Sequence, residues 1–263
     1  MLNDFDMVIH KFDNSITVIP VSDVHIGALE HNKTKWESFV KSVLKEPDTY
    51  LTLGGDLVNN STRCSVANPF DEVLRPREQK QRMVEYLKPL AAEGRILCAV
   101  SGNHEYRTTK ESDQDITYDI MSKLDIEDLY RENAVFMKVG LGKRSNANKP
   151  VASYTLMVQH GAGGGIYTGA TVNRNERFGN VIDGLDCMIV GHTHKGTVSK
   201  PSKIVIDSNN NTVSLKSYTV ISTVSWLNYA GYALRKMLLP AESCEPQKIK
   251  LRCSQQKRIE CIW

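Results

Sequence analysis

The sequence predicts an α/β fold in which two mixed β-sheets pack together as a β-sandwich core flanked by helices. In the first half of the chain, short apolar runs alternate with amphipathic segments, which is typical of strand–helix–strand units. From residue 134 onward, apolar runs follow one another across turn-rich segments, as in β-hairpins. Because the strand–helix units come first and the hairpins later, we expect two sheets packed face to face. The length of 263 residues suits a single domain, with core motifs within 16–240 and C-terminal strands within 241–263.

The first half of the chain provides the strand–helix units. Thr34 and Glu37 have the spacing of a capping box, and Pro47 ends the helix that they begin. Pro89 is expected to kink or end the second helix. In chain order, we expect an edge strand or arm over 1–15, a strand over 16–25, a helix over about 34–45, a strand over 50–53, an irregular loop over 59–78, a helix over about 78–92, a strand over 96–100 and a helix over about 114–124.

The second half of the chain provides the hairpins. The segment 140–150 is rich in turn residues, and three asparagines at 209–211 mark a second turn. Residues 166–186 have no clear period and remain unassigned. The expected strands are 134–139 with 151–159 as one hairpin, 203–207 with 212–217 as another, and 218–225, 248–253 and 258–262.

The net charge, the lengths of the apolar runs and the cysteine spacing exclude some classes of protein. A formal net charge of +3 is too small to indicate nucleic-acid or membrane binding by itself. No apolar run approaches the roughly 18 residues that span a bilayer, so no membrane partner is expected. The acidic N-terminus does not resemble a signal peptide, and six scattered cysteines without C-x-x-C spacing favour reduced thiols. We therefore expect a cytoplasmic protein.

Five apolar runs share one feature: each ends in Asp, His or Asn, usually beside Gly. If the five strands lie side by side, these polar side chains meet at one edge, where layered α/β folds bind ligands. Such a cluster predicts a site for more than one metal ion. The runs and their polar ends are 16–22 with Asp23 and His25, 50–53 with Asp56, 96–100 with Asn103 and His104, 154–159 with His160, and 187–190 with His192 and His194.

These motifs, in this order, resemble those of the calcineurin-like metallophosphoesterases. The resemblance covers residues 23–194 and implies two divalent metal ions bridged by the carboxylate of Asp56. A water that bridges the ions would attack phosphorus, and His104 would stabilise the phosphate and protonate the leaving oxygen. The ligand types favour Mn²⁺, with Fe or Zn²⁺ as alternatives. The implied ligands are Asp23, His25, Asp56 and His194 for the first ion, and Asp56, Asn103, His160 and His192 for the second.

The sequence departs from the family pattern near the catalytic histidine. Many members carry an acidic residue three positions after the bridging aspartate, where this chain has Asn59. The Asn59 amide can still hold the imidazole, although it stabilises the protonated ring less. Arg107 could reach the substrate phosphate or form a salt bridge with Glu105 or Glu111, and we include Asn59 and Arg107 as candidate substrate contacts. The Asp-Arg-Gly of protein phosphatases is missing after Asp56, so that activity is not inferred.

Three functions remain open for a chain that takes a phosphoester substrate. The first is a phosphodiesterase. The second is a DNA or RNA nuclease, for which the basic residues of the 59–82 loop would line a nucleic-acid track; a solvated charged surface is the simpler reading of that loop. The third is a metal-bearing scaffold that binds a protein partner without catalysis. The aromatic segment 225–235 could stack a base, pack the sheet edge or form an oligomer contact.

Overall fold

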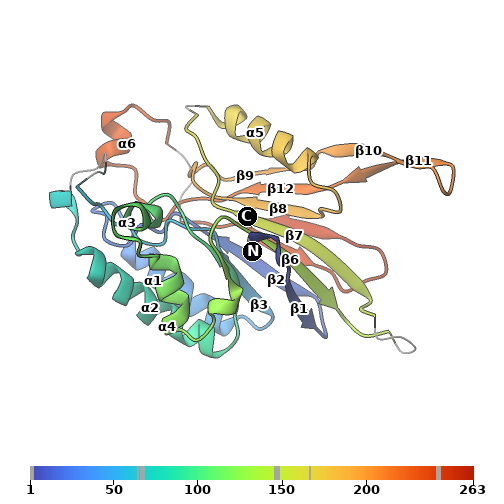
Figure 1. The fold of residues 1–263 in the computed structure, drawn as a ribbon, viewed down its shortest axis with the longest axis horizontal. Coiled ribbons are helices and arrows are strands. Elements are labelled where there is room, and N and C mark those ends of the chain that lie inside the picture. Colours follow the sequence, from blue (N-terminus) through green and yellow to red (C-terminus); the bar gives the residue numbers. More distant parts are fainter. Residues whose placement is uncertain (1–2, 64, 66–68, 145–148, 166, 241–243) are drawn as a thin grey trace.

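The computed structural model describes residues 3–63, 65, 69–144, 149–165, 167–240 and 244–263. The strands within these residues form two six-stranded sheets and a separate two-stranded ribbon (Figure 1). The predicted pair of packed sheets flanked by helices is therefore confirmed.

The first sheet has the order β14-β13-β2-β3-β4-β5. Strands β2 to β5 run parallel to one another, while β13 is antiparallel to both β2 and β14. All residues of β4 are buried, as expected for a strand that is covered on both faces. The bounds are β2 Ile16–Val21, β3 Thr49–Leu53, β4 Ile96–Val100, β5 Tyr130–Arg131, β13 Lys248–Leu251 and β14 Ile259–Ile262.

The second sheet has the order β1-β6-β7-β8-β12-β9. The predicted hairpin of β6 and β7 is confirmed by antiparallel pairing from Ala134↔Gln159 to Leu141↔Ala152, although part of its turn, 145–148, lies outside the described residues. The second predicted hairpin is the two-stranded ribbon. The bounds are β1 Val8–Phe12, β6 Ala134–Leu141, β7 Ala152–Gln159, β8 Cys187–Val190, β9 Thr197–Ser199 and β12 Thr219–Ser222, with β10 Ser202–Asp207 and β11 Thr212–Ser217 in the ribbon.

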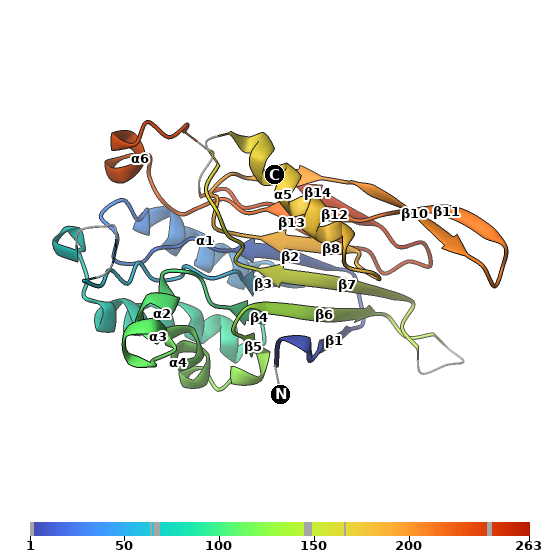
Figure 2. The ribbon, with the colours of Figure 1, turned by 45° about the horizontal axis from the view of Figure 1, so that its top comes forward.

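The core has three apolar layers. The central layer fills the space between the sheets and includes Val18, Cys98 and Leu156. A second layer lies between the first sheet and the helices α1, α2 and α4, and a third lies under α5 on the second sheet (Figure 2). The helices are α1 Lys33–Lys45, α2 Pro76–Ala92, α3 Glu105–Ser112, α4 Ile116–Lys123, α5 Thr168–Asn180 and α6 Gly231–Arg235, with short 3-10 turns at Asn3–Phe5, Pro69–Asp71 and Glu127–Leu129.

Several helix predictions need correction. The side chain of Asn32 caps α1 by accepting a hydrogen bond from the Lys35 N–H at 3.1 Å, so the capping box predicted at Thr34 was wrong. Pro89 lies inside α2, within the last turn before the helix ends at Ala92. The helix predicted over 114–124 is the shorter α4, capped by Asp115, and α3 precedes it.

We had expected the five strands with polar ends to lie side by side in one sheet, but the structure divides them between the two sheets. Strands β2, β3 and β4 belong to the first sheet, whereas β7 and β8 belong to the second. Because the two sheets face each other, the carboxyl ends of all five strands still meet at the same end of the sandwich. The sandwich thus positions polar groups from two layers around one site.

Three further observations concern the rest of the described chain. His10 and His31, which lie outside the motifs, are half-buried and hydrogen-bonded to main-chain carbonyls of Leu97 and Val24, both at 2.8 Å. Cys98, Cys187, Cys253 and Cys261 are free thiols, and Cys64 lies outside the described residues. Among the described helices, none combines the length and apolar character needed to cross a membrane.

Candidate metal centre

The site is built from sharp backbone corners at the ends of the strands. Five of its residues have a left-handed backbone, which costs an L-residue roughly 1–2 kcal/mol. The corners allow consecutive polar side chains to turn toward the space between the sheets. The residues are Asp23 (φ 53°), His25 (φ 49°), Asp56 (φ 51°), His192 (φ 70°) and His194 (φ 57°).

A first cluster forms around Asp23, which is fully buried. Its Oδ1 lies 3.1 Å from His194 Nε2 and 3.9 Å from His25 Nε2. Its Oδ2 accepts hydrogen bonds from the Ser22 hydroxyl and from the main-chain N–H of His192, the latter at 2.9 Å. Oδ1 is buried and accepts no hydrogen bond, so the orientation of the carboxylate leaves one oxygen directed at the two imidazoles.

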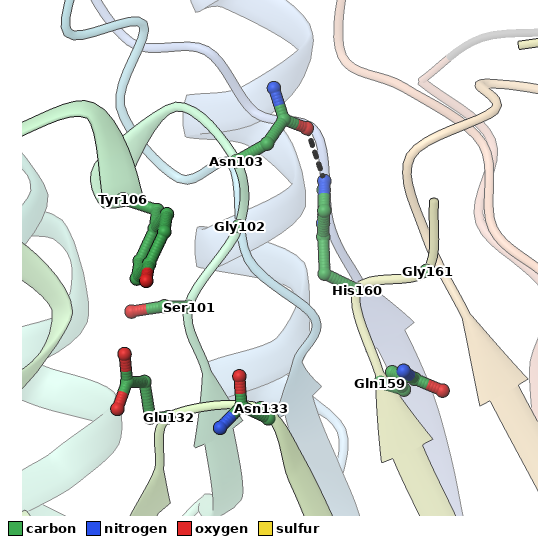
Figure 3. Close-up of a pocket in the computed structure, with 9 residues that line it drawn as sticks. All are labelled: Ser101, Gly102, Asn103, Tyr106, Glu132, Asn133, Gln159, His160 and Gly161. Carbon is green, nitrogen blue, oxygen red and sulfur yellow. Dashed lines mark hydrogen bonds between the residues drawn. The ribbon is translucent and has the colours of Figure 1, made fainter. Parts of the chain in front are cut away.

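A second cluster contains His160, His192 and Asn103. Asn103 Oδ1 lies 3.0 Å from His160 Nε2 (Figure 3) and 2.8 Å from His192 Nδ1. The other ring nitrogen of His160, Nδ1, donates a hydrogen bond to the carbonyl of Gly54 at 2.8 Å. This bond fixes the tautomer and leaves the Nε2 lone pair directed into the cluster.

Asp56 lies between the two clusters. Its Oδ2 is 3.9 Å from His25 Nε2 and 3.3 Å from His160 Nε2, while Oδ1 accepts a hydrogen bond from the His104 N–H at 2.9 Å. Gly102 makes this approach possible, because a Cβ there would lie 2.1 Å from Asp56 Oδ1.

The electrostatics of the site follow from this geometry. Burial alone would lower the pKa of His160, but the charge and hydrogen bond of Asp56 raise it to about 10. Burial would raise the pKa of Asp23, but the nearby His194 lowers it to about 2. Burial, together with the neighbouring His104, holds the pKa of His25 well below its usual value. Since a metal ligand must be a neutral imidazole, we expect cation binding to release the proton of His160.

His104 faces Asp56 from the other side of the site. Its Nε2 lies 3.8 Å from Asp56 Oδ2, and its Nδ1 donates a hydrogen bond to the main-chain carbonyl of Asn59 at 2.6 Å. The expectation that the Asn59 amide holds the ring was wrong, because that amide donates to Ser61 Oγ at 3.2 Å and to Glu72 Oε1 at 2.9 Å. Burial lowers the pKa of His104, and the nearby Arg107 lowers it further.

Arg107 lies behind the His104 ring. Its Nη1 donates a hydrogen bond to the Asn59 carbonyl at 3.1 Å and lies 3.1 Å from His104 Nδ1. The guanidinium is therefore on the side of the ring that faces away from Asp56. In this conformation it supports the loop that holds His104.

The Asp, Asn and His side chains that meet at the strand ends have the donor atoms and spacing to hold a pair of divalent cations. Three groups of His and Asp side chains place their ligand atoms within 4.8 Å of one another: Asp23 with His25 and His194, His25 with Asp56 and His104, and Asp56 with His160 and His192. Asp23 Oδ1 has no hydrogen-bond partner, and His160 Nε2 points at the other proposed ligands, so both atoms are placed to coordinate once His160 is deprotonated. Carboxylate, amide and imidazole donors together suit first-row transition metals.

A family model for the calcineurin-like phosphoesterases matches residues 16–196, which include all of these residues. The chain belongs to the calcineurin-like phosphoesterase family. The comparison with curated proteins gives no match.

Two solved structures are similar to this phosphoesterase at low identity. One is a conserved uncharacterized protein, described as a predicted phosphoesterase, from Streptococcus pneumoniae, with 11% identity, a TM-score of 0.39, and coverage of 94% of this chain and 89% of the other. The second is the calcineurin-like phosphoesterase YfkN from Bacillus subtilis, with 12% identity, a TM-score of 0.38, and coverage of 94% and 88%.

Glu105 contributes to the phosphoesterase site in a way that the sequence did not predict, since the sequence suggested only a possible salt bridge with Arg107. It is fully buried at the start of α3, and its carboxylate accepts four main-chain hydrogen bonds. The donors are the N–H groups of Asp56 (2.9 Å), Leu57 (2.6 Å), Val58 (3.1 Å) and Gly102 (2.9 Å). Glu105 therefore ties the loop after β3 to the loop after β4. Glu105 directly follows His104 in the sequence, but that position does not reveal which donors its carboxylate meets.

A groove of about 200 Å³ adjoins the second cluster of this phosphoesterase. Figure 3 shows Asn103 and His160 on one side and Tyr106 with Glu132 on the other. The groove is open to solvent, and polar and apolar atoms line it in about equal measure. Its lining comprises Ser101, Gly102, Asn103, Tyr106, Glu132, Asn133, Gln159, His160 and Gly161.

Proposed function

We propose that the chain is a phosphodiesterase that depends on two divalent metal ions. The observation that carries the proposal is the place of Asp56, whose Oδ2 lies within 4 Å of imidazole nitrogens from both clusters. A carboxylate shared in this way is what a pair of neighbouring cations needs. The proposed ligands are Asp23, His25, Asp56 and His194 for one ion, and Asp56, Asn103, His160 and His192 for the other.

The proposed cations are Mn²⁺, with Fe or Zn²⁺ as alternatives, because the donors are nitrogen and oxygen without thiolate. Bound cations would supply Lewis-acid chemistry here, both for the attacking water and for the charge on the phosphate oxygens. The buried Asp23 and the oriented His160 would hold the cations in fixed positions.

His104 is the proposed proton donor to the leaving oxygen. The Asn59 carbonyl can accept the Nδ1 proton whether the ring is neutral or charged, so only Nε2 changes its protonation. Nε2 lies on the side of Asp56 and the clusters. As the bond between phosphorus and the leaving oxygen breaks, that oxygen would take the Nε2 proton, and the ring would regain a proton from water.

The groove beside Asn103 and His160 supports a diester rather than a monoester. A diester carries a second organic group, and a groove of about 200 Å³ can take a ring-sized substituent next to the phosphate. The exposed Tyr106 ring offers a stacking face, while Glu132 and Gln159 offer polar contacts.

A nuclease is the second candidate, and the observation that favours it is the distribution of basic residues over 59–82, a segment that includes the start of α2. Lys80 pairs with Asp119 at 2.5 Å and Arg82 with Glu85 at 3.3 Å. Arg63, Arg75 and Arg77 are exposed and have no ion pair within the described part of the chain. Exposed guanidinium groups near a phosphoesterase site could contact a nucleic-acid backbone.

The test is hydrolysis by chelator-stripped protein with Mn²⁺ added back. The substrates are bis-p-nitrophenyl phosphate and labelled single- and double-stranded DNA and RNA, with His104→Ala as the control. We expect Mn²⁺-dependent turnover of the small diester that is lost in His104→Ala. Cleavage of a polynucleotide, lost in the same variant, would make the protein a nuclease. If the protein binds metal but hydrolyses none of these substrates, the proposed enzymatic activity is refuted and a scaffold is favoured.

A further inference from the structure

Two consecutive residues of the loop after β3 hold His104 at two points. The main-chain carbonyl of Asn59 accepts the hydrogen bond of the ring Nδ1 at 2.6 Å. The next residue, Asn60, contacts the main chain of His104 instead, because its Nδ2 donates to the His104 carbonyl at 2.7 Å. The ring and the backbone of His104 are therefore fixed to the same short loop.

The side-chain amide of Asn60 is buried, and its partners determine its orientation. Its exposed fraction is 1%, so these hydrogen bonds are shielded from water. A main-chain carbonyl can only accept, so the atom that faces the His104 carbonyl is the NH₂ group. The hydroxyl of Thr108, one turn further along α3, lies 2.7 Å from Nδ2 and 3.1 Å from Oδ1. The amide is thus bound to the start of α3 through both of its polar atoms.

Helix α2 holds the backbone of Asn60 from another side. The Asn60 N–H donates to Gln79 Oε1 at 2.8 Å, and Gln79 Nε2 donates to the carbonyl of Leu74 at 2.7 Å. Gln79 is fully buried and lies against Gly27, where an added Cβ would come within 2.3 Å of its Nε2. The backbone of Asn60 is left-handed (φ 44°), a conformation that asparagine adopts more readily than most residues. Asn60 therefore links α2 to the residue that begins α3.

We propose that Asn60 is a positioning residue that holds His104 at the angle from which it protonates the leaving oxygen. This inference rests on the proposed function, in which His104 is the proton donor. Asn60 acts through the main chain of His104 and not on the phosphate. A displacement of about 1 Å can cost a catalytic group on the order of 10²-fold in rate. Because the Asn59 carbonyl holds Nδ1, a shift of the His104 backbone relative to that loop would turn Nε2 away from the leaving oxygen.

A purely structural role for Asn60 predicts a different pattern of loss. A residue that only stabilises the loop would loosen the whole site and affect all substrates alike. A residue that positions a proton donor matters most where the leaving oxygen most needs the proton. Leaving groups of different basicity therefore separate the two roles.

The experiment compares two diesters that differ only in the leaving group, p-nitrophenyl methyl phosphate and phenyl methyl phosphate. Phenolate is the more basic leaving group of the two. The protein is the full chain with Mn²⁺, and Asn60→Gly removes the amide while suiting the left-handed backbone. We expect this variant to lower kcat by about 10²-fold on the phenyl ester and by about tenfold or less on the p-nitrophenyl ester, at unchanged KM.

Two further variants make the comparison specific. Thr108→Val is the matched control, because it removes the other partner of the same amide and leaves the bond to His104 in place. Its kcat should change by the same factor on both esters. Asn60→Asp has the shape of asparagine and tolerates the same backbone, but an ionised carboxylate cannot donate to the His104 carbonyl. It should reproduce the leaving-group dependence of Asn60→Gly.

A second readout does not need turnover. The Asn59 carbonyl favours the tautomer of the neutral His104 ring that carries its proton on Nδ1, and the NMR shifts of the ring nitrogens report this tautomer. With isotope-labelled histidine, His104→Ala identifies the signal by its absence. Asn60→Gly should give a mixture of tautomers, whereas Thr108→Val should keep the wild-type signal.

Three results would overturn the proposal. Equal losses of kcat on the two esters in Asn60→Gly would make its role structural. A leaving-group dependence of the same size in Thr108→Val would assign the effect to the loop as a whole. An unchanged His104 signal in Asn60→Gly would show that the ring does not depend on Asn60. A wild type that hydrolyses neither ester would refute the proposed function instead, and the NMR comparison would still decide whether Asn60 holds His104.

Discussion

Glu105 shows how one side chain can hold a metal centre together without taking part in its chemistry. Its pKa is raised to about 7 by burial and by the negative charge of Asp56. Four main-chain N–H donors oppose that shift, because they are best matched by an ionised carboxylate. The four donors therefore favour the ionised carboxylate, the charge of Asp56 disfavours it, and bound cations would offset that repulsion.

At the residue scale, we predict that Glu105→Gln loosens the site. The amide NH₂ would face main-chain N–H groups that now donate to an oxygen, which leaves at least one buried donor unsatisfied. The free energy of unfolding should fall by about 3 kcal/mol, as measured by urea denaturation. Mn²⁺ affinity should fall with it, because the loop that carries Asp56 loses its anchor. A variant as stable as the wild type would show that these four bonds contribute little.

A second prediction at this scale concerns His104. Replacing a general acid typically costs about 10²–10⁴-fold in turnover, so His104→Ala should lose that much kcat on bis-p-nitrophenyl phosphate. Because its ring is not among the proposed ligands, Mn²⁺ stoichiometry by equilibrium dialysis should stay at the wild-type value. Loss of bound metal in this variant would instead make His104 a ligand.

The residues of the site differ in how far the sequence could predict them. Asp23, Asp56 and His160 each end an apolar run, and strand direction alone places them at one edge. The contact of Asn59 with His104 was not predictable, because the main-chain carbonyl makes it and any residue at position 59 supplies a carbonyl. A side-chain pattern carries no information about such a bond.

At the element scale, the helices that the sequence did not predict have polar buried faces. The buried residues of α5 are Thr171, Asn175 and Gly179, at helical spacing but without apolar character. Gly179 lies against Tyr218, where a Cβ would come within 2.6 Å of the ring. In α3 the buried residue is Glu105. Apolar periodicity cannot detect a helix that packs through small and polar groups.

Strand β1 provides a prediction about pH. Burial lowers the pKa of His10, whose Nε2 donates across the sandwich to the carbonyl of Leu97 in β4. The unfolded chain takes up a proton near pH 6.5, while the folded chain resists it, so the free energy of unfolding falls as pH drops below about 6.5.

The measurement is urea denaturation of the wild type and His10→Gln at pH 7.5 and pH 5.5. The wild type should lose more stability between these pH values than His10→Gln, since the variant lacks this titrating group. Other histidines titrate in both proteins and cancel in the comparison. Equal losses would assign the pH dependence to those other residues.

At the scale of the whole molecule, the sequence predicted two packed sheets but not how the strands divide between them. Local patterns identify strands, whereas pairing depends on contacts between residues far apart in the chain, such as Leu251 of β13 with Ile16 of β2. The polar strand ends still meet in the structure, because facing sheets bring their strand ends together as well as neighbouring strands do.

The prediction at this scale is that metal removal destabilises the entire sandwich. The proposed ligands come from both sheets, so a cation that binds the folded chain would stabilise it by about 2.7 kcal/mol at a hundredfold excess over Kd. For a domain of this size that corresponds to a Tm lower by about 5–10 °C after chelation, measured by scanning calorimetry. Asp56→Asn should lose most of the Mn²⁺-dependent shift. A Tm that does not respond to Mn²⁺ would argue against a site shared by the two sheets.

The left-handed corners at Asp23, His25, Asp56, His192 and His194 have a consequence for how this chain can change over time. At each of these positions glycine would relieve backbone strain, so a mutational search that rewards stability alone would drift toward glycine and erase the donors. Protein engineering that selects residues by backbone preference would replace the side chains of the candidate metal centre first. Any library built on this scaffold should hold those five positions fixed.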